Sequence, residues 1–273
     1  MDILSKIVKH KEKEVAERKG LYPLKLLEQS IYFETPSISL RQYIKRTDKS
    51  GIIAEIKRRS PSKGDINPHV SVERTSIGYM QAGASALSVL TDNTFFGGSS
   101  EDLTTARKFN FCPILRKDFV IDEYQLIEAK SIGADVVLLI AAILDPQKLR
   151  RLCATAQSLQ MEVLLEVHDE EELKNNLEAL PDVIGVNNRN LKTFEVSTDL
   201  SKRLVQCIPN DFVKVSESGI DTPSTAADLR DCGFDGFLIG GLFMRSGRPE
   251  HAAMEFIKEL NRLEKKTKTD ATH

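Results

Sequence analysis

Short runs rich in valine, isoleucine and leucine recur eight times from residue 52 onward, and longer amphipathic segments separate them. Strand-length runs that alternate with helix-length segments indicate βαβ units and a parallel sheet, and eight such units close a barrel. Some of the runs also fit buried helix segments, because periodicity does not separate the two over six residues. The pattern therefore predicts an α/β chain folded as a single (β/α)8 barrel. The predicted strands occupy residues 52–58, 86–92, 113–119, 135–144, 162–168, 183–190, 212–219 and 236–243.

The junctions between the predicted elements support this repeat. Three helix-to-strand junctions, AGASALSVL, IGADVVLLI and CGFDGFLIG, read alike and place Gly83, Gly133 and Gly233 where a helix end needs a left-handed residue. Asp145 and Thr222, each followed by proline, are typical of helix starts.

The first fifty residues do not fit the repeat and predict two helices joined near Tyr22-Pro23. We therefore divide the chain into an N-terminal helical extension (1–50), the barrel (51–265) and a frayed polar tail (266–273). Two roles are equally compatible with this extension: it could stabilise the fold by capping one end of the barrel, or it could help to cover a bound substrate.

Composition excludes several classes of function. The chain has 38 basic and 40 acidic residues, and a formal charge of -2 argues against nucleic acid or an anionic membrane as the main partner. No apolar stretch approaches the roughly 18 uncharged residues of a membrane-spanning helix. The four cysteines form no CxxC pair and no export signal is present, which predicts a cytoplasmic protein with reduced thiols. The five histidines are scattered and no HExxH motif occurs, so we expect no metal.

Alternation along the first predicted strand places two charges inside the barrel. In IIAEIKR, the side chains of Ile53, Glu55 and Lys57 share one face, and Ala54 and Ile56 share the other. The apolar face must pack against the outer helices, so Glu55 and Lys57 point inward. Two charges need the solvent-filled mouth at the carboxyl ends of the strands, where function lies in this fold.

The same alternation sends polar side chains to that rim from four further strands. They are Lys117, Glu166, Asn187, Arg189 and Glu217. Taken singly, each fits a salt bridge at the rim equally well. The joint appearance of lysines and glutamates on one rim favours a catalytic site.

Glycine-rich loops end the last two predicted strands. Ser218-Gly219 follows the seventh and Gly240-Gly241 follows the eighth, where many such barrels supply backbone N–H groups to a phosphate. The basic segment KRRSPSKGD adds Ser60 as a further phosphate contact. The glycines also fit simple tight turns.

In these residues the chain resembles the indole-3-glycerol phosphate synthase family, from residue 50 to residue 255. The segments that carry the resemblance follow the family's order and spacing: EIKRRSPSKG, LSVLTD with FFGGS, PILRKDF with IDEYQ, LLEVH, GVNNRNL, SESGI and FLIGG. The sequence departs from the family at Gly241, where members often carry a side chain.

The resemblance implies a carboxy-lyase of tryptophan biosynthesis, a monomer that needs no cofactor. The reaction closes the pyrrole ring of 1-(2-carboxyphenylamino)-1-deoxyribulose 5-phosphate, with loss of carbon dioxide and then water, and yields indole-3-glycerol phosphate. Lys117 resembles the general acid, Glu166 the general base, and Lys57 the partner of the substrate carboxylate. Glu55 is similar to the group that orients the lysines. Which lysine serves which step stays open.

The resemblance also implies binding roles. Asn187, Arg189 and Glu217 are similar to polar contacts of the substrate. Phe95 and Phe119 resemble side chains that pack on the aromatic ring, although Phe95 fits a loop anchor equally well. The implied phosphate contacts are Ser60, Ser218, Gly219, Gly240 and Gly241.

Two alternatives remain at this point. A phosphoribosylanthranilate isomerase-like enzyme would share the phosphate site but needs an acid and a base for an Amadori rearrangement. A catalytically silent barrel that binds phosphosugars would be expected to lose a reactive residue.

Overall fold

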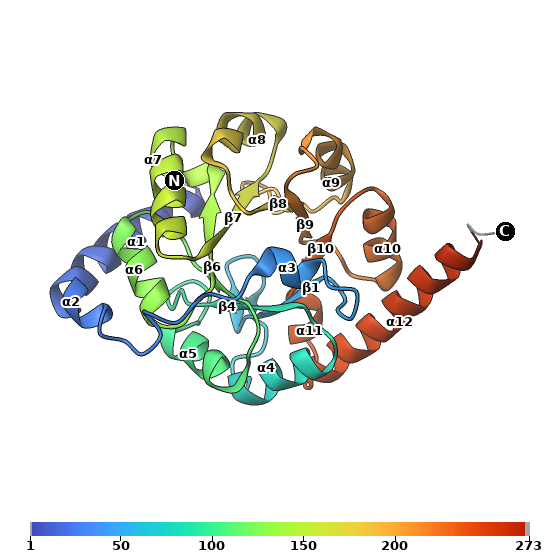
Figure 1. Cartoon of the computed structure of the whole chain (residues 1–273), viewed down its shortest axis with the longest axis horizontal. Coiled ribbons are helices and arrows are strands. Elements are labelled where there is room, and N and C mark those ends of the chain that lie inside the picture. The colour runs from blue at the N-terminus through green and yellow to red at the C-terminus, as the bar shows by residue number, and fades with distance from the viewer. Residues whose placement is uncertain (1, 271–273) are drawn as a thin grey trace.

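Eight parallel strands form a closed barrel in the computed structural model, which describes residues 2–270, with side chains through residue 265 (Figure 1). Every strand lies within one of the predicted runs, so the predicted fold class is confirmed. The strands are shorter than predicted because the residues at their carboxyl ends belong to loops or, after β6 and β10, to the short helices Ala141–Ile143 and Gly241–Met244. They are β1 (Ile52–Ile56), β4 (Ala86–Leu90), β5 (Ile114–Lys117), β6 (Val136–Ile140), β7 (Glu162–Val167), β8 (Val183–Asn187), β9 (Val213–Glu217) and β10 (Gly236–Ile239).

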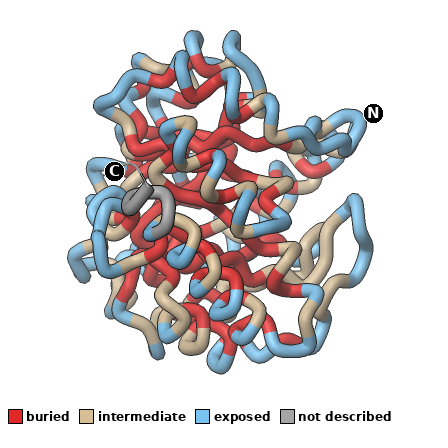
Figure 2. The backbone as a smooth tube through the Cα atoms, turned by 90° about the vertical axis from the view of Figure 1, so that its right-hand side faces the viewer, coloured by how far each residue is buried: buried red, intermediate tan, exposed pale blue. Residues whose placement is uncertain are grey.

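A layer of helices surrounds the barrel and buries its outer face (Figures 1 and 2). Asp145 and Thr222 cap α7 and α10 as predicted, because each side chain accepts a hydrogen bond from the backbone N–H three residues later. Gly83, Gly133 and Gly233 have φ of 99°, 92° and 113°, which confirms the left-handed helix ends. The layer consists of α4 (Val72–Gln81), α5 (Ser100–Phe109), α6 (Glu123–Ser131), α7 (Pro146–Ser158), α8 (Glu170–Asn176), α9 (Asp199–Leu204), α10 (Pro223–Asp231) and α12 (Pro249–Asp270), with short turns at α11 (Gly241–Met244), η1 (Ala141–Ile143), η2 (Leu177–Ala179) and η3 (Val205–Cys207).

The two faces of the strands belong to two separate apolar cores. Val163 and Leu165 of β7 pack in the core between strands and helices, whereas Leu164 joins Leu115 and Leu138 in the core inside the barrel. The predicted alternation is therefore confirmed. The fixed register between neighbouring strands places the inward-pointing residues at the carboxyl ends of the strands around one rim of the barrel.

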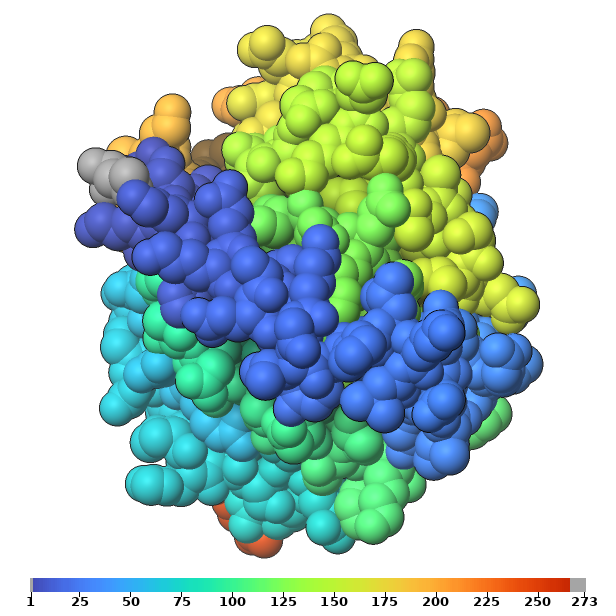
Figure 3. Space-filling model, turned by 90° about the vertical axis from the view of Figure 1, so that its left-hand side faces the viewer, coloured from blue at the N-terminus to red at the C-terminus, as the bar shows by residue number. Residues whose placement is uncertain are grey.

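The N-terminal extension crosses both ends of the barrel. It consists of α1 (Ile3–Leu21), α2 (Leu24–Leu27) and α3 (Leu40–Ile44), and Figure 3 shows it lying along one side of the molecule. The predicted junction at Tyr22-Pro23 is confirmed, but α3 was not predicted, since five residues are too few for a helical period. The backbone N–H of Arg41 donates to Glu162 at the start of β7, and Ile44 joins the inner core. This places α3 at the amino ends of the strands.

Two further segments differ from the sequence expectation. A two-stranded hairpin, β2 (Arg59–Ser60) and β3 (Gly64–Asp65), follows β1 inside the basic segment. Helix α12 continues to Asp270 through most of the segment predicted as a tail, of which residues 271–273 lie outside the described residues. Among the described helices, none is long and apolar enough to cross a membrane.

Candidate active site

A cavity of about 340 Å³ opens at the carboxyl ends of the strands. A volume of this size suits a small-molecule ligand. All predicted site residues line it except Phe95. They are Glu55, Lys57, Ser60, Lys117, Phe119, Glu166, Asn187, Arg189, Glu217, Ser218, Gly219, Gly240 and Gly241.

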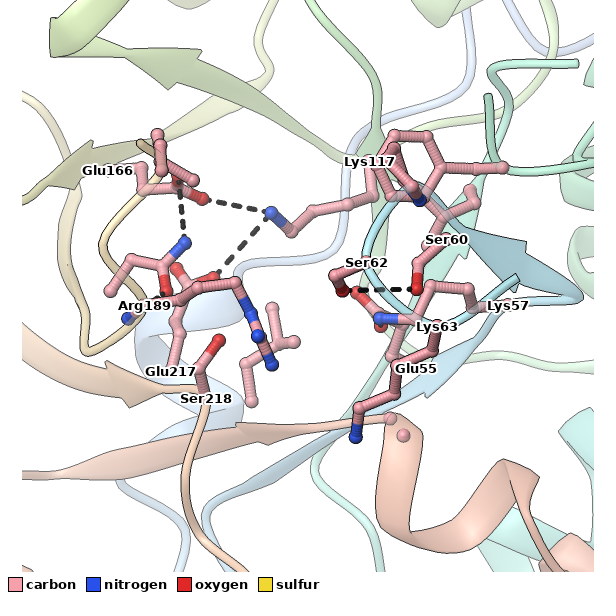
Figure 4. Close-up of a pocket in the computed structure, with 18 of the residues that line it drawn as sticks. Glu55, Lys57, Ser60, Ser62, Lys63, Lys117, Glu166, Arg189, Glu217 and Ser218 are labelled. Atoms are coloured by element: carbon pink, nitrogen blue, oxygen red, sulfur yellow. Dashed lines mark hydrogen bonds and ion pairs between the residues drawn. The ribbon is translucent and has the colours of Figure 1, made fainter. Parts of the chain in front are cut away.

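Lys117 is the centre of an ion cluster inside the cavity. Its Nζ lies 2.9 Å from Oε2 of Glu166 and 3.6 Å from Oε2 of Glu217, and Figure 4 shows it reaching between these two acids. Asn187 donates a hydrogen bond of 3.1 Å to the other oxygen of Glu166. A second ion pair joins Lys57 to Glu55 at the end of β1. The cavity therefore holds lysine ammonium groups as acids and carboxylates as bases.

Burial and mutual charge shift the pKa values of this cluster in opposite directions. Burial lowers the pKa of Lys117, but the carboxylates of Glu166, Glu217 and Glu55 outweigh it, so the pKa is raised and the ammonium persists. Burial raises the pKa of Glu166, and the opposing charges of Lys117 and His168 outweigh it, so the pKa is lowered. For Glu217, burial raises the pKa, the charge of Lys117 lowers it, and repulsion from Glu166 raises it further. The pKa of Glu217 is raised to about 7 as a result.

His168 lies behind Glu166 and was not predicted as a site residue. Its Nε2 is 3.3 Å from Oε1 of Glu166, and its Nδ1 is 3.1 Å from Oε2 of Glu172. Burial lowers the pKa of His168, but the two carboxylates outweigh this and raise it to about 10. Sequence position alone did not reveal it, because the contact depends on where β7 ends and α8 begins.

Gly185 makes room for Glu217, and sequence analysis gave it no role. A Cβ atom at this position of β8 would lie 2.4 Å from Oε1 of Glu217 and 2.8 Å from Cδ2 of Leu164. Glycine in a strand interior often marks such a close approach. The glycine inside the run VIGVN was the available signal.

The opposite wall of the cavity is cationic. The hairpin β2–β3 brings Ser60 and Lys63 over the cavity beside Lys57 (Figure 4). Burial, followed by the charges of Arg245 and Arg189, lowers the pKa of Lys63. Such clustering of positive charge favours an anionic ligand.

The loop after β9 has an unusual backbone beside this wall. Ser218 has φ of 66° and Gly219 has φ of 73°, and Asn188 holds the segment by donating to the carbonyl oxygen of Ser218 at 3.1 Å. Left-handed conformation at a residue other than glycine costs free energy and is concentrated at functional sites. Gly240 and Gly241 of the last loop line the same part of the cavity.

Phe95, expected either to pack on the substrate ring or to anchor a loop, does not line the cavity, whereas Phe96 does. The backbone N–H groups of Phe95 and Phe96 both donate to Oδ1 of Asp92, at 2.7 and 3.1 Å, and this turn sends the two rings apart. Phe95 packs edge-on against His10 of α1. Phe96 lines the cavity, with its ring centroid 5.9 Å from that of Phe119.

Helix α1 also contributes to the wall of the cavity. Ile3, Leu4 and Ile7 line the cavity, whereas α3 lies at the other barrel end. The extension thus both covers one end and supplies cavity wall. Its apolar spacing was visible in the sequence, but the strand ends that it faces were not.

Comparisons with known proteins agree with this geometry. A family model described as "Indole-3-glycerol phosphate synthase" matches residues 4–259. Proteins named indole-3-glycerol phosphate synthase include one from Bacteroides thetaiotaomicron, which is 48% identical over 259 residues, covering 95% of this chain and 99% of that protein. Another, from Magnetococcus marinus, is 41% identical over 263 residues, covering 94% and 98%.

Solved structures of low identity share the fold alone. Thiamine phosphate pyrophosphorylase from Pyrococcus furiosus matches with a TM-score of 0.59 and 16% identity, covering 81% of this chain and 99% of that chain. A structure described as "Native KDPGal structure" matches with a TM-score of 0.57 and 15% identity, covering 79% and 94%.

Proposed function

This chain belongs to the indole-3-glycerol phosphate synthase family, and from that premise we propose that its cavity converts 1-(2-carboxyphenylamino)-1-deoxyribulose 5-phosphate to indole-3-glycerol phosphate. Such enzymes are carboxy-lyases of tryptophan biosynthesis. The observation that carries the proposal is the ammonium of Lys117, held between Glu166 and Glu217 in a cavity with a cationic opposite wall.

In the proposed first step, the aryl carbon that bears the carboxylate attacks the ketone carbon. The electron pair of the carbonyl moves to oxygen, which takes a proton from Lys117 as general acid. Glu166 and Glu217 orient this ammonium, and their charges keep it protonated until the oxygen becomes basic. The ring nitrogen becomes an iminium ion.

Decarboxylation and dehydration follow from that intermediate. The electrons of the carbon–carboxylate bond move into the iminium system as carbon dioxide leaves, so the substrate supplies its own electron sink and needs no cofactor. Glu166 then removes a proton from the carbon next to nitrogen. The hydroxyl group leaves as water with a proton from a lysine, for which Lys57 beside Glu55 is the candidate.

The remaining cavity residues are proposed to bind the substrate. The loops of Ser218-Gly219 and Gly240-Gly241 supply backbone donors to the phosphate, with the hydroxyl of Ser60. The two other proposed groups are the polar contacts Asn187, Arg189 and Glu217, and the ring contacts Phe119 and Phe96.

The proposal includes a monomer that acts in the cytoplasm. The buried thiols of Cys112 and Cys153 are free, and burial raises the pKa of each to about 12, so they are unreactive as thiolates. This is consistent with a reducing compartment.

The test is direct, because the chain contains no tryptophan, so the indole fluorescence of the product is measured without tryptophan emission from the protein. We expect the wild type to convert the carboxyphenylamino substrate. Lys117→Met is expected to lower kcat by at least about 100-fold with KM changed only a few-fold, as for a group that acts in the transition state. Lys174→Met, at an exposed pair with Glu170, is the control. Turnover of phosphoribosylanthranilate in place of this substrate would contradict the proposal.

A further inference from the structure

Lys11 of α1 is a fully buried ammonium at the junction between the N-terminal helix and the barrel. Its Nζ lies 3.0 Å from Oδ1 of Asp118, 3.1 Å from Oδ2 of Asp92 and 3.0 Å from Glu14. The side chains of Lys11 and Asp92 are 0% exposed and that of Asp118 is 1% exposed. Lys11 thus joins α1 to the loops that follow two barrel strands, β4 and β5.

A buried charge of this kind persists only when its partners are close. Burial lowers the pKa of Lys11, but the charges of Asp118, Asp92 and Glu14 outweigh it and raise the pKa. The pKa of Asp118 is correspondingly lowered to about 2, since the charges of Lys11 and Arg116 outweigh its burial. Lys11 and Asp118 therefore both stay ionised near neutral pH.

The two carboxylates that hold Lys11 also hold the aromatic wall of the cavity. Oδ1 of Asp92 accepts the backbone N–H of Phe96 at 3.1 Å. Oδ1 of Asp118 accepts the backbone N–H of Phe119 at 2.8 Å. The two rings are in contact and line the cavity. Asp92 contacts the lysine with one oxygen and the backbone of Phe96 with the other, whereas Oδ1 of Asp118 contacts both the lysine and the backbone of Phe119.

We propose that Lys11 is a positioning residue that fixes Phe96 and Phe119, through Asp92 and Asp118, as the surface on which the aromatic ring of the substrate packs. The inference rests on the proposed function for the identity of that ring. Lys11 also holds Ile7, one turn earlier on α1, against the same cavity. Substrate affinity through the ring then depends on a side chain that never touches the substrate.

If Lys11 only held α1 in place, other ion pairs of α1 would have the same effect on activity. The chain offers one such ion pair as a matched control. Arg18 lies on the same helix and forms an ion pair with the buried Glu128 of α6, away from the cavity. Lys11→Met and Arg18→Met each replace a cation with an unbranched apolar side chain of good helix propensity. Both loosen α1, but only the first breaks the link to Asp92 and Asp118.

We expect Lys11→Met to raise KM for the carboxyphenylamino substrate about tenfold with kcat within about threefold of wild type, the pattern of lost uniform binding. Arg18→Met is expected to change both constants less than about threefold. Fluorescence titration with indole-3-glycerol phosphate should show the same tenfold loss of affinity for Lys11→Met. Competition by inorganic phosphate should be unchanged, because the phosphate loops do not contact Lys11. Equal effects of the two variants, or equal loss of phosphate binding, would overturn the inference.

Two further variants keep the inference testable where Lys11→Met folds poorly. Asp92→Asn retains an oxygen for the N–H of Phe96 but loses the ion pair, so KM should rise in the same direction; wild-type KM would contradict the link. In a Phe96→Ala background, Lys11→Met should raise KM by clearly less than tenfold, because one of the two rings that Lys11 positions is already absent. If the effects of Phe96→Ala and Lys11→Met on KM simply multiplied in the double variant, the inference would also be overturned. Turnover by the wild type tests the proposed function alone. A failure of the proposed function can therefore be distinguished from a failure of the inference about Lys11.

Discussion

Glu166 on β7 and Glu217 on β9, the strands on either side of β8, are the same residue type, yet their environments separate them. The charges of Lys117 and His168 keep Glu166 ionised, whereas Glu217 is left with a weaker contact to the same lysine and repulsion from Glu166. Two carboxyl groups with divergent pKa values can serve different roles in one reaction. Because its lowered pKa keeps Glu166 in the carboxylate form, Glu166 is the group that is free to accept a proton near neutral pH.

Glu166→Gln is expected to lower kcat by about 100-fold or more with KM within a few-fold, because the amide keeps the shape and cannot accept a proton. Steady-state kinetics by indole fluorescence measures both constants. The matched control is Glu172→Gln, because Glu172 contacts the far side of His168 and not Glu166. This variant should retain most of the wild-type kcat. A raised KM with unchanged kcat for Glu166→Gln would assign it to binding instead.

His168 makes folding stability depend on pH. Its pKa is raised from 6.5 to about 10 in the folded chain, so the stabilisation is fully present below pH 6.5 and is lost as pH rises through 10. His168→Gln should therefore cost a few kcal/mol of unfolding free energy at pH 6 and little at pH 10.5. Urea denaturation at both pH values checks this. A cost independent of pH would show that the imidazole is neutral.

Helix α6 contacts the extension at both of its ends. The side chain of Tyr124 donates to the carbonyl oxygens of Arg18 and Tyr22, at 2.9 and 3.0 Å. At the other end of the helix, Lys130 donates to the carbonyl oxygen of Thr35 at 2.8 Å. Because α6 is short and makes these contacts at both ends, its stability depends on a well-formed N-terminal cap.

Asp122 caps α6 within a capping box and accepts the backbone N–H of Tyr124. Asp122→Ala should lower the unfolding free energy by about 1 kcal/mol, because the N–H loses its partner. Asp122→Asn keeps the cap and loses only the exposed ion pair with Lys19, so it should cost less than about 0.5 kcal/mol. Urea denaturation compares the two. Equal losses would mean that the ion pair, and not the cap, stabilises this helix start.

One buried network joins the barrel, the helical layer and the extension. Arg116 points away from the cavity on β5 and donates to Glu128, Asp118, Thr91 and the carbonyl oxygen of Gln125. Burial lowers its pKa, but the two carboxylates outweigh this and raise it. The network thus connects layers that are far apart in the sequence.

Arg116→Leu is expected to destabilise the fold by about 3–5 kcal/mol, because it removes the buried cation that Asp118 and Glu128 share and leaves each of these carboxylates with a single cation. Arg151→Leu removes an exposed pair with Glu123 and should cost less than about 1 kcal/mol. Chemical denaturation gives both values. A neutral Arg116→Leu would show that hydrophobic packing replaces the network fully.

The sequence by itself determined the barrel and most of the cavity, because both follow from local periodicity. Eight runs define eight strands, and alternation within a run sends Glu55, Lys117 and Glu166 to the inner face whatever the loops do. Glycines and helix caps are likewise short-range, and Gly83 and Asp145 occupy their predicted places.

Only the tertiary structure decided how separate segments meet. The choice of Phe96 over Phe95 depends on a turn held by Asp92, and the role of His168 depends on the distance between β7 and α8. Lys11 is one charged residue among many in a helix until the fold brings two loops around it. Contacts between distant segments depend on register, loop path and burial together, and no local pattern encodes them.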